Sequence, residues 1–308
     1  MSTAPVRGRF VWHELMTTDT KSAAAFFTKV VGWKTRTWDQ EPSYTMFVAN
    51  GAPMAGVLSH AADAKTIGAP TTWLTYIGTP DVEETARQAM ELGGKILKQP
   101  ADIPTIGRFA IIQDPQGAAF AAFTPIQPPR GDRMGEVEIG DFSWHELPTT
   151  DRTAAFEFYQ RLFGWEPTES MDMGSEGGVY RGIYQMFGWK GKSLGGMFTK
   201  AADMPGPPAW IAYVKVVDTK KAARTVKKLG GTIVTGPMQV PDGDWVALGL
   251  DPQGALFAIH SKLVATKTTA AKLPAKTRTT RKRAAKKAVR KARPAKRTAA
   301  AKRSKARR

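Results

Sequence analysis

The sequence contains no cysteine, which excludes disulfide bonds and thiolate metal sites. No apolar run approaches the roughly 18 residues that span a bilayer. The first residues also lack the basic segment and apolar run of a secretory signal. These absences predict a soluble protein, with the cytoplasm as the expected compartment and no transmembrane segment.

Acidic residues are missing from the last part of the chain. Residues 262–308 hold 20 of the 45 lysines and arginines and no aspartate or glutamate. The other 25 basic residues face 27 acidic ones, so residues 1–261 carry a net charge of −2. The overall charge of +18 therefore describes the tail, whereas the body is near neutral.

Aromatic residues are absent from the same tail, which consists almost entirely of Lys, Arg, Ala, Thr and Pro. Such a segment cannot bury enough apolar surface to fold alone, so residues 263–308 are predicted to be disordered. Its Ala-Lys-Lys-Ala and Pro-Ala-Lys-Arg sequences resemble the tails of linker histones and bacterial nucleoid proteins. A flexible polycation without stacking platforms is expected to bind nucleic acid with little sequence preference. The predicted contacts are Lys282, Arg283, Lys286, Lys287, Arg290 and Lys291. The alternatives are a solubilising tail, or one that binds polyphosphate or anionic lipid.

A long internal repeat is the strongest pattern in the body. Trp12-His13-Glu14-Leu15 recurs as Trp144-His145-Glu146-Leu147, and Asp114-Pro115-Gln116-Gly117 recurs as Asp251-Pro252-Gln253-Gly254. The offset grows from 132 to 137 between these motifs, which predicts a loop insertion around Met171 to Gly178. We therefore predict a domain over residues 8–125, a linker over 126–140 and a second domain over 141–262.

Each copy is predicted to contain two βαβββ units, which makes the fold class α+β. A strand over 10–17 leads to Asp19, whose carboxylate can cap a helix over 20–31. Three strands follow, near 35–38, 44–49 and 54–59. The second unit repeats the order, with a strand over 72–79, a helix from Asp81 to Gly93-Gly94, and strands over 108–113 and 118–123 around the Asp-Pro-Gln-Gly turn.

Paired units with an Asp-capped helix, a Gly-Trp sequence and Asp-Pro-x-Gly before the last strand resemble the vicinal oxygen chelate (VOC) superfamily. This group includes glyoxalase I, extradiol dioxygenases and bleomycin-resistance proteins. The resemblance covers residues 8–262 and is strongest to the two-domain, glyoxalase-like type with Trp-x-Glu-Leu near the start of each domain. It implies that each domain forms a cup-shaped mixed sheet with flanking helices. The fold hosts many chemistries and does not define the activity.

The resemblance also implies where a divalent ion would bind, because metal-dependent members carry His or Glu ligands at four strand positions in each cup. In this chain those positions hold Trp12, Gly56, Leu74 and Ala121 in the first copy, and Trp144, Gly196, Ile211 and Ala258 in the second. None of these side chains can ligate Mg²⁺, Zn²⁺, Fe²⁺ or Ni²⁺. We therefore predict no metal site and no cofactor.

Glu14 and Glu146 are the candidate catalytic residues. Strand side chains alternate, so each glutamate shares the cup face with the tryptophan two residues before it. Desolvation there would raise the pKa of the carboxyl, as suits a general base. The alternative is a structural ion pair or hydrogen bond between units. His13 and His145 point to the helix side and are predicted to be packed, hydrogen-bonded structural residues.

Other side chains on the cup face are candidate ligand-binding residues. Trp12 and Trp144 are predicted to form aromatic walls of an apolar pocket, and Tyr76 and Tyr213 either donate to a ligand carbonyl or fill the cup. His260 is present only in the second copy. It could form an acid–base pair with Glu146, or be a solvated residue at a strand end. We find no Ser/His/Asp order typical of a hydrolase.

Three functions are compatible with these patterns. The first is a metal-independent, glyoxalase-like protein that binds or transforms a small molecule as a lyase would. The second is a sequestering protein that binds a ligand or antibiotic, as bleomycin-resistance proteins do. The third is a nucleoid-associated protein with an accessory body. The ligand, the cup that binds it and the formation of a homo-oligomer are left open.

Overall fold

A computed structural model describes residues 6–60, 70–127, 137–174 and 181–262. Residues 1–264 form one compact unit that contains both repeats. The predicted disorder of the tail, most of the predicted linker and part of the predicted loop insertion lie outside the described residues. Met171 and Asp172, at the start of that insertion, lie in a strand.

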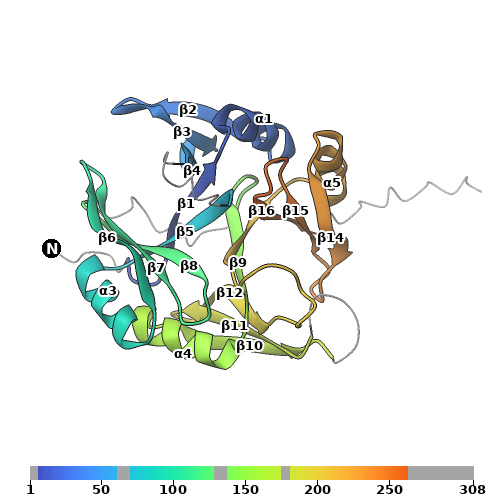
Figure 1. Cartoon of the computed structure of the whole chain (residues 1–308). Helices are drawn as coiled ribbons and strands as arrows, with labels where there is room; N and C mark the ends of the chain where they lie inside the picture. Colours follow the sequence, from blue (N-terminus) through green and yellow to red (C-terminus); the bar gives the residue numbers. More distant parts are fainter. Residues whose placement is uncertain (1–5, 61–69, 128–136, 175–180, 263–308) are drawn as a thin grey trace, which may run out of the picture. The chain divides into compact units, whose positions relative to one another are not determined.

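Each repeat has the predicted order βαβββ twice (Figure 1). The first repeat contains β1 (Phe10–Thr17), α1 (Thr20–Val30), β2 (Lys34–Trp38), β3 (Glu41–Ala49), β4 (Ala52–Ser59), β5 (Thr72–Gly78), α3 (Val82–Glu91), β6 (Lys95–Ile103), β7 (Gly107–Gln113) and β8 (Ala119–Pro125). The second contains β9 (Phe142–Thr149), α4 (Arg152–Phe163), β10 (Glu166–Asp172), β11 (Ile183–Trp189), β12 (Lys192–Thr199), β13 (Ile211–Lys215), α5 (Thr219–Lys228), β14 (Thr232–Gln239), β15 (Trp245–Leu250) and β16 (Leu256–Ser261).

The strands of each repeat form one mixed, eight-stranded sheet. The order is β2-β3-β4-β1-β5-β8-β7-β6 in the first and β10-β11-β12-β9-β13-β16-β15-β14 in the second. In both sheets the first strands of the two units pair antiparallel at the centre, and each pairs parallel with the last strand of its own unit. The predicted α+β class and tandem cup-shaped sheets are confirmed.

Aspartates cap the N-termini of the four helices within the described residues, as the sequence predicts for two of them. The Asp19 carboxylate accepts from the backbone N–H of Ser22 at 3.0 Å, and Asp81 accepts from Glu84 at 2.9 Å. Asp151 and Asp218 cap α4 and α5 in the same way. The Asp114 carboxylate also accepts from two backbone N–H groups of its turn, which places β7 and β8 side by side.

Two large hydrophobic cores combine residues of both repeats. In one core, Phe26 and Phe27 of α1 pack with Val226 of α5 and Phe257 of β16. In the other, α3 lies against α4, and Phe120 packs on Tyr159. Figure 1 shows the two helix pairs, α1 with α5 and α3 with α4. Each repeat therefore buries its helices against the other repeat.

Two reciprocal hydrogen bonds join the repeats. The indole of Trp33 donates to the carbonyl of Gly140, and that of Trp165 donates to the carbonyl of Gly8, both at 2.7 Å. Both glycines have positive φ, and a Cβ on Gly8 would lie 2.9 Å from the Trp165 indole nitrogen. The repeated Gly-Trp sequences thus serve the contact between the two copies.

Candidate functional site

A carboxylate held by two tyrosines lies inside each cup. Glu14 accepts from the hydroxyl groups of Tyr44, at 2.7 Å, and Tyr76, at 2.8 Å. Glu146 accepts from Tyr184 at 3.1 Å and from Tyr213 at 3.0 Å. The structure thus brings together both predicted glutamates and both predicted tyrosines, and each glutamate is buried.

The predicted tryptophans complete these networks. The indole of Trp12 donates to the Tyr44 hydroxyl at 3.1 Å, and that of Trp144 donates to the Tyr184 hydroxyl at 2.8 Å. Trp144 also lines a cavity, and its place against a ligand stays a prediction. In each cup a chain of hydrogen bonds therefore runs from indole to phenol to carboxylate.

Glycines make room for the two tyrosines that were not among the predicted site residues. A Cβ on Gly56 would lie 1.8 Å from the Tyr44 hydroxyl oxygen, and a Cβ on Gly196 would lie 2.1 to 2.3 Å from the Tyr184 ring and hydroxyl. Gly56 pairs with Glu14 in the sheet, and Gly196 pairs with Glu146. The missing side chains therefore let the phenols reach the carboxylates.

Tyr44 and Tyr184 left a signal in the sequence. The motif Tyr44-Thr45-Met46-Phe47 recurs as Tyr184-Gln185-Met186-Phe187, at an offset of 140. This offset differs from the 132 and 137 of the other motifs, because the insertion falls nearby. A search of the repeat at this third offset would have found both residues.

The residues of the cup do not fit the family's divalent ion. The four ligand positions hold tryptophan, glycine, an aliphatic residue and alanine in both cups, and a tyrosine ring fills the space beside the glycine. Glu14 and Glu146 are single carboxylates that accept from phenols. Within the described parts of the chain no group of three His, Asp or Glu side chains could hold a metal ion.

Burial shapes the acidity of the first cup. Burial raises the pKa of the Glu14 carboxyl, and the hydrogen bonds from Tyr44 and Tyr76 oppose that rise. Burial and the neighbouring Glu14 charge raise the pKa of both tyrosines, which therefore remain hydrogen-bond donors. The direction predicted for Glu14 from its surroundings agrees with the structure.

The two cups differ in what surrounds this network. In the first cup Phe109 and Phe123 lie near Tyr76, with ring centroids 6.1 and 6.2 Å away, in an apolar cluster. The repeat offset of 137 places Val246 and His260 at these positions in the second cup. The replacement of two phenylalanines by smaller side chains leaves more room there.

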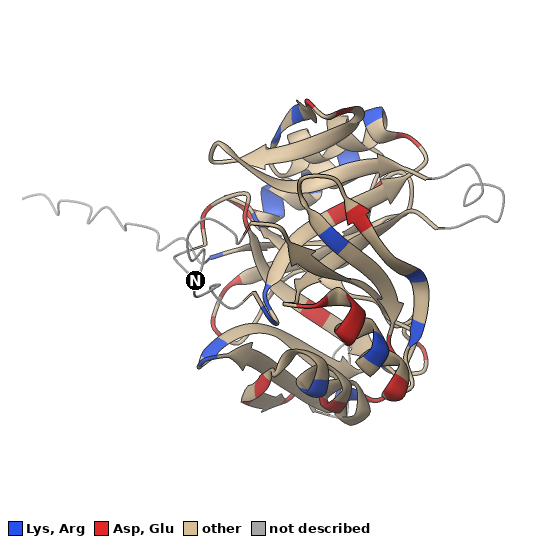
Figure 2. Cartoon of the chain, turned by 90° about the vertical axis from the view of Figure 1, so that its left-hand side faces the viewer, with Lys and Arg blue, Asp and Glu red and all other residues tan. Residues whose placement is uncertain are grey.

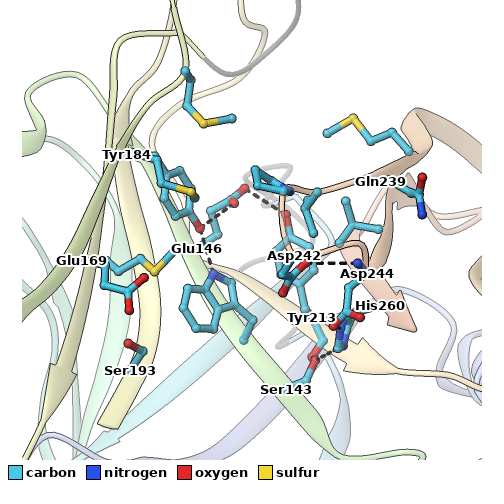
Figure 3. A pocket seen from close by; sticks show the side chains of 18 residues that line it. Ser143, Glu146, Glu169, Tyr184, Ser193, Tyr213, Gln239, Asp242, Asp244 and His260 are labelled. Atoms are coloured by element: carbon cyan, nitrogen blue, oxygen red, sulfur yellow. Dashed lines mark hydrogen bonds and ion pairs between the residues drawn. The ribbon is translucent and has the colours of Figure 1, made fainter. Parts of the chain in front are cut away.

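The second cup contains a cavity of about 660 Å³ (Figure 3). Glu146, Tyr184 and Tyr213 lie together in its wall, and four methionines supply flexible apolar surface. The side chains that line the cavity include Ser143, Trp144, Glu146, Met171, Met173, Tyr184, Met186, Tyr213, Met238, Asp244, Val246 and His260.

A second polar group lies in the wall of the same cavity. His260 Nε2 lies 2.8 Å from Asp244 Oδ2, and His260 Nδ1 lies 3.1 Å from the Ser143 hydroxyl. Both ring nitrogens are therefore engaged away from Glu146, and the alternative of a Glu146–His260 acid–base pair gains no support from this geometry. A Ser/His/Asp group, which the sequence order did not indicate, is instead formed by Ser143 of β9 with Asp244, just before β15, and His260 of the paired strand β16.

A strand irregularity explains the position of Ser143. The register of β9 against β13 shifts so that Trp144 pairs with Tyr213 and Phe142 with Val214, which leaves Ser143 as an extra residue. Ser143 and Trp144 can then both line the cavity despite being neighbours. The equivalent residue of the first repeat is Val11, which packs in the apolar cluster.

His13 and His145 form a structural pair, as predicted. Their Nε2 atoms lie 2.8 Å apart, and Phe142 and Phe10 stack on the two rings. The contact of His145 Nδ1 with the Leu194 carbonyl at 3.4 Å makes His145 Nε2 the acceptor of this bond. Burial lowers the pKa of both rings, that of His145 to about 3, so both are neutral near pH 7.

A family model of the Glyoxalase/Bleomycin resistance protein/Dioxygenase superfamily matches residues 9–121 and 141–259. The chain therefore belongs to this superfamily, and both repeats carry its domain. It is 29% identical to a putative glyoxylase, CFP32, of Mycobacterium tuberculosis, over 80% of this chain and 92% of that protein. It is also 29% identical to the anthracycline biosynthesis protein DauV of Streptomyces sp. strain C5, over 82% of this chain and 92% of that protein.

Solved structures share the fold at lower identity. The Mn(II)-bound glyoxalase from Novosphingobium aromaticivorans superposes with a TM-score of 0.54 and 15% identity, over 84% of this chain and 83% of that one. The 2,3-dioxygenase LapB from Pseudomonas sp. KL28 gives a TM-score of 0.56 and 10% identity, over 84% of this chain and 94% of that one.

None of the helices in the described parts of the chain has the length and hydropathy of a membrane-spanning segment.

Proposed function

We propose that the chain binds a small, largely apolar molecule in its second cup, with Glu146 as the hydrogen-bond acceptor and without the divalent ion of the superfamily. The observation that carries this proposal is the 660 Å³ cavity, which has the Glu146 network in its wall. Cavities of this size accommodate drug-sized ligands, and a few placed polar groups then fix the orientation.

Binding is favoured over proton abstraction by the hydrogen bonds of Glu146. Phenols donate to both of its carboxylate oxygens, so both oxygens already serve as hydrogen-bond acceptors. A carboxylate offers about four lone-pair sites, more than two phenols occupy. Glu146 is thus suited to bind a donor group.

The ligand class is supported by the lining and by the relatives. Met171, Met173, Met186 and Met238 can adapt to a broad apolar surface, and the Trp144 indole offers a flat one. Two relatives with 29% and 28% identity bear the names of anthracycline biosynthesis proteins. A planar polycyclic molecule with phenolic hydroxyl groups fits these features.

The test is a titration of the protein with a dihydroxyanthraquinone in the absence of nucleic acid. Binding is measured by the change in tryptophan fluorescence. Glu146→Gln should weaken binding by roughly 10-fold to 100-fold, because a hydrogen bond to a charged group contributes about 1.5 to 3 kcal/mol. Glu14→Gln is the matched control in the first cup and should bind normally. Equal weakening by both variants, or no binding by the wild-type chain, would contradict the proposal.

The enzymatic alternative has its own readout. A glyoxalase-like lyase should convert a methylglyoxal–thiol adduct in the presence of a chelator, and Glu146→Gln should abolish this turnover. Ligand binding without turnover leaves the sequestering function. Turnover that a chelator abolishes would refute action without a metal ion.

We also propose that the basic tail associates with nucleic acid and places the protein on the nucleoid. The supporting observation is the run of 20 basic residues without an acid or aromatic side chain in residues 262–308. Glutamine at Lys282, Arg283, Lys286, Lys287, Arg290 and Lys291 of the full chain should reduce the salt dependence of DNA binding. Unchanged salt dependence would refute the role of these six residues.

A further inference from the structure

Helix α5 carries an unusual concentration of positive charge. Its ten residues include Lys220, Lys221, Arg224, Lys227 and Lys228 and no acid, and all five basic side chains are exposed. Within the described residues none of the five forms an ion pair. We infer that this face of α5 binds the phosphate backbone of double-stranded nucleic acid, as a folded extension of the proposed binding by the tail.

The equivalent helix of the first repeat shows that the fold does not require this charge. The offset of 137 aligns Glu83, Glu84 and Glu91 of α3 with Lys220, Lys221 and Lys228 of α5. Arg87, the one basic residue of α3, forms ion pairs with Glu84 and Glu91. The two helices therefore share a place in the fold and differ in net charge from −2 to +5.

The first-turn charges of α5 oppose the stability of the helix, whereas Lys227 and Lys228 lie in the last turn, where the helix dipole favours cations. Lys220 and Lys221 lie in the first turn, where the helix dipole disfavours cations and where α3 instead has two glutamates. Arg224 also lies four residues from both Lys220 and Lys228, a spacing at which like charges repel. A phosphate backbone would relieve both effects, so the arrangement is explained by a polyanionic partner.

The neighbouring surface extends the basic face. Helix α1, which lies against α5, contributes exposed Lys21 and Lys29 and contains no acid. On the side of the body that Figure 2 presents, acidic and basic residues are intermingled. A surface hollow of about 280 Å³ beside Pro237 is lined by Lys220, Arg224 and Lys227. A phosphate group bound in this hollow would contact these basic side chains.

The end of β16 lies at the first residue of α5. The backbone N–H of Thr219, the first residue of α5, donates to the Ser261 hydroxyl at 3.2 Å, and the two hydroxyl oxygens lie 2.9 Å apart. Lys262, the first basic residue after β16, follows directly in the sequence. Ser261, at the end of β16, therefore lies beside the first turn of α5.

A lipid surface fits α5 less well than nucleic acid does. Interfacial helices insert an apolar face among the lipid headgroups. The apolar side chains of α5, Ala222, Ala223 and Val226, are buried in the core of the body. No apolar face of this helix is therefore left for a bilayer, and its exposed face offers charge alone.

The test uses the full chain and a mixed-sequence DNA duplex of 30 base pairs. The α5 variant carries glutamine at positions 220, 221, 224, 227 and 228. The control variant removes the same charge from exposed positions outside α5, with glutamine at Lys34, Arg36, Lys95, Lys98 and Lys190. The slope of log affinity against log salt should fall by about 3 to 4 in the α5 variant and by less than 1 in the control.

A stability measurement separates binding from folding. The α5 variant should unfold at a temperature close to that of the wild-type chain, because it removes both the unfavourable first-turn lysines and the favourable last-turn lysines. Equal slopes for the α5 and control variants would overturn the inference. So would an α5 variant that loses binding to vesicles with 30% phosphatidylserine and keeps its DNA affinity. The six-residue tail variant is measured in parallel, so failure of the tail proposal is seen separately.

Discussion

One hydroxyl group distinguishes the two equivalent cores that the repeats share, one around Trp210 and the other around Trp73. Tyr159 donates to Asp114 at 3.0 Å and accepts from the Trp210 indole at 2.9 Å. In the other half Phe27 occupies the place of Tyr159, and its ring meets Trp73 with the same edge-on geometry. Within the described residues, the Trp73 indole nitrogen and Asp251 Oδ2 are buried there without a hydrogen-bond partner.

Phe27→Tyr should therefore stabilise the protein by about 1 to 2 kcal/mol, because a new hydroxyl would satisfy two buried polar atoms. Tyr159→Phe should destabilise it by about 1 to 3 kcal/mol, since it creates the same deficit in the other half. Urea denaturation of both variants checks the pair. A destabilising Phe27→Tyr would mean that the two halves do not have the same space beside Trp73 and Trp210.

Gly196 tests whether the tyrosine network depends on a missing side chain. Gly196→Ala should cost about 1 to 3 kcal/mol, because its Cβ would lie 2.1 Å from the Tyr184 ring. The same substitution in a Tyr184→Ala background should cost less than about 1 kcal/mol, since the obstructing ring is gone. Urea denaturation measures the unfolding free energy of each variant in this double-mutant cycle. Additive effects would contradict the proposed coupling between Gly196 and Tyr184.

At the scale of elements, the sequence predicted what depends on local patterns. Asp19 and Asp81 predicted where α1 and α3 begin, and the helix predicted over 20–31 ends at Val30. Tyr44 was not among the predicted site residues. Its hydroxyl reaches Glu14 because Gly56, in the neighbouring strand, has no side chain. The Ser143 group was missed for a similar reason, since the bulge of β9 decides which way that side chain points.

The difference between the cups also belongs to the elements, since β15 and β16 supply Val246 and His260. Val246→Phe with His260→Phe installs the side chains of the first repeat and should fill the cavity. Anthraquinone binding should fall at least tenfold, while the unfolding free energy changes by less than about 2 kcal/mol, because large side chains replace empty space.

The reverse pair, Phe109→Val with Phe123→His, is the control in the first cup. It should leave binding by the second cup unchanged, as measured by the same fluorescence titration. If the filled second cup still binds the probe with wild-type affinity, the ligand is bound elsewhere on the protein.

At the scale of the whole body, the two repeats meet around His13 and His145. Phe10 and Phe142 cover the pair, and the reciprocal bonds of Trp33 and Trp165 join the repeats at two further points. Equivalent residues thus make equivalent contacts across the body. The histidine pair is a buried contact between the repeats. Both rings must be neutral there, because burying a charged ring would cost free energy.

The pair should make the body sensitive to acid. In the unfolded chain a histidine takes up a proton near the ordinary histidine pKa of about 6.5, whereas burial keeps the folded pKa of His145 at about 3 and lowers that of His13. The unfolded state therefore binds more protons in this window, and stability falls as the pH drops below about 6.5. Each ring should contribute a loss of about 1.4 kcal/mol per pH unit.

A variant with glutamine at both positions isolates this effect, because it retains hydrogen-bonding groups that do not titrate. The raised pKa values of Glu14, Asp114 and Asp251 act in the opposite direction, since the folded state then binds their protons more readily, but they are common to both proteins and cancel in the comparison. Between pH 7.5 and 5.5 the wild-type chain should lose about 1 to 3 kcal/mol of unfolding free energy relative to the variant. Urea denaturation across this range measures the difference, and parallel curves would mean that the histidine pair accepts protons in the folded protein as readily as in the unfolded chain.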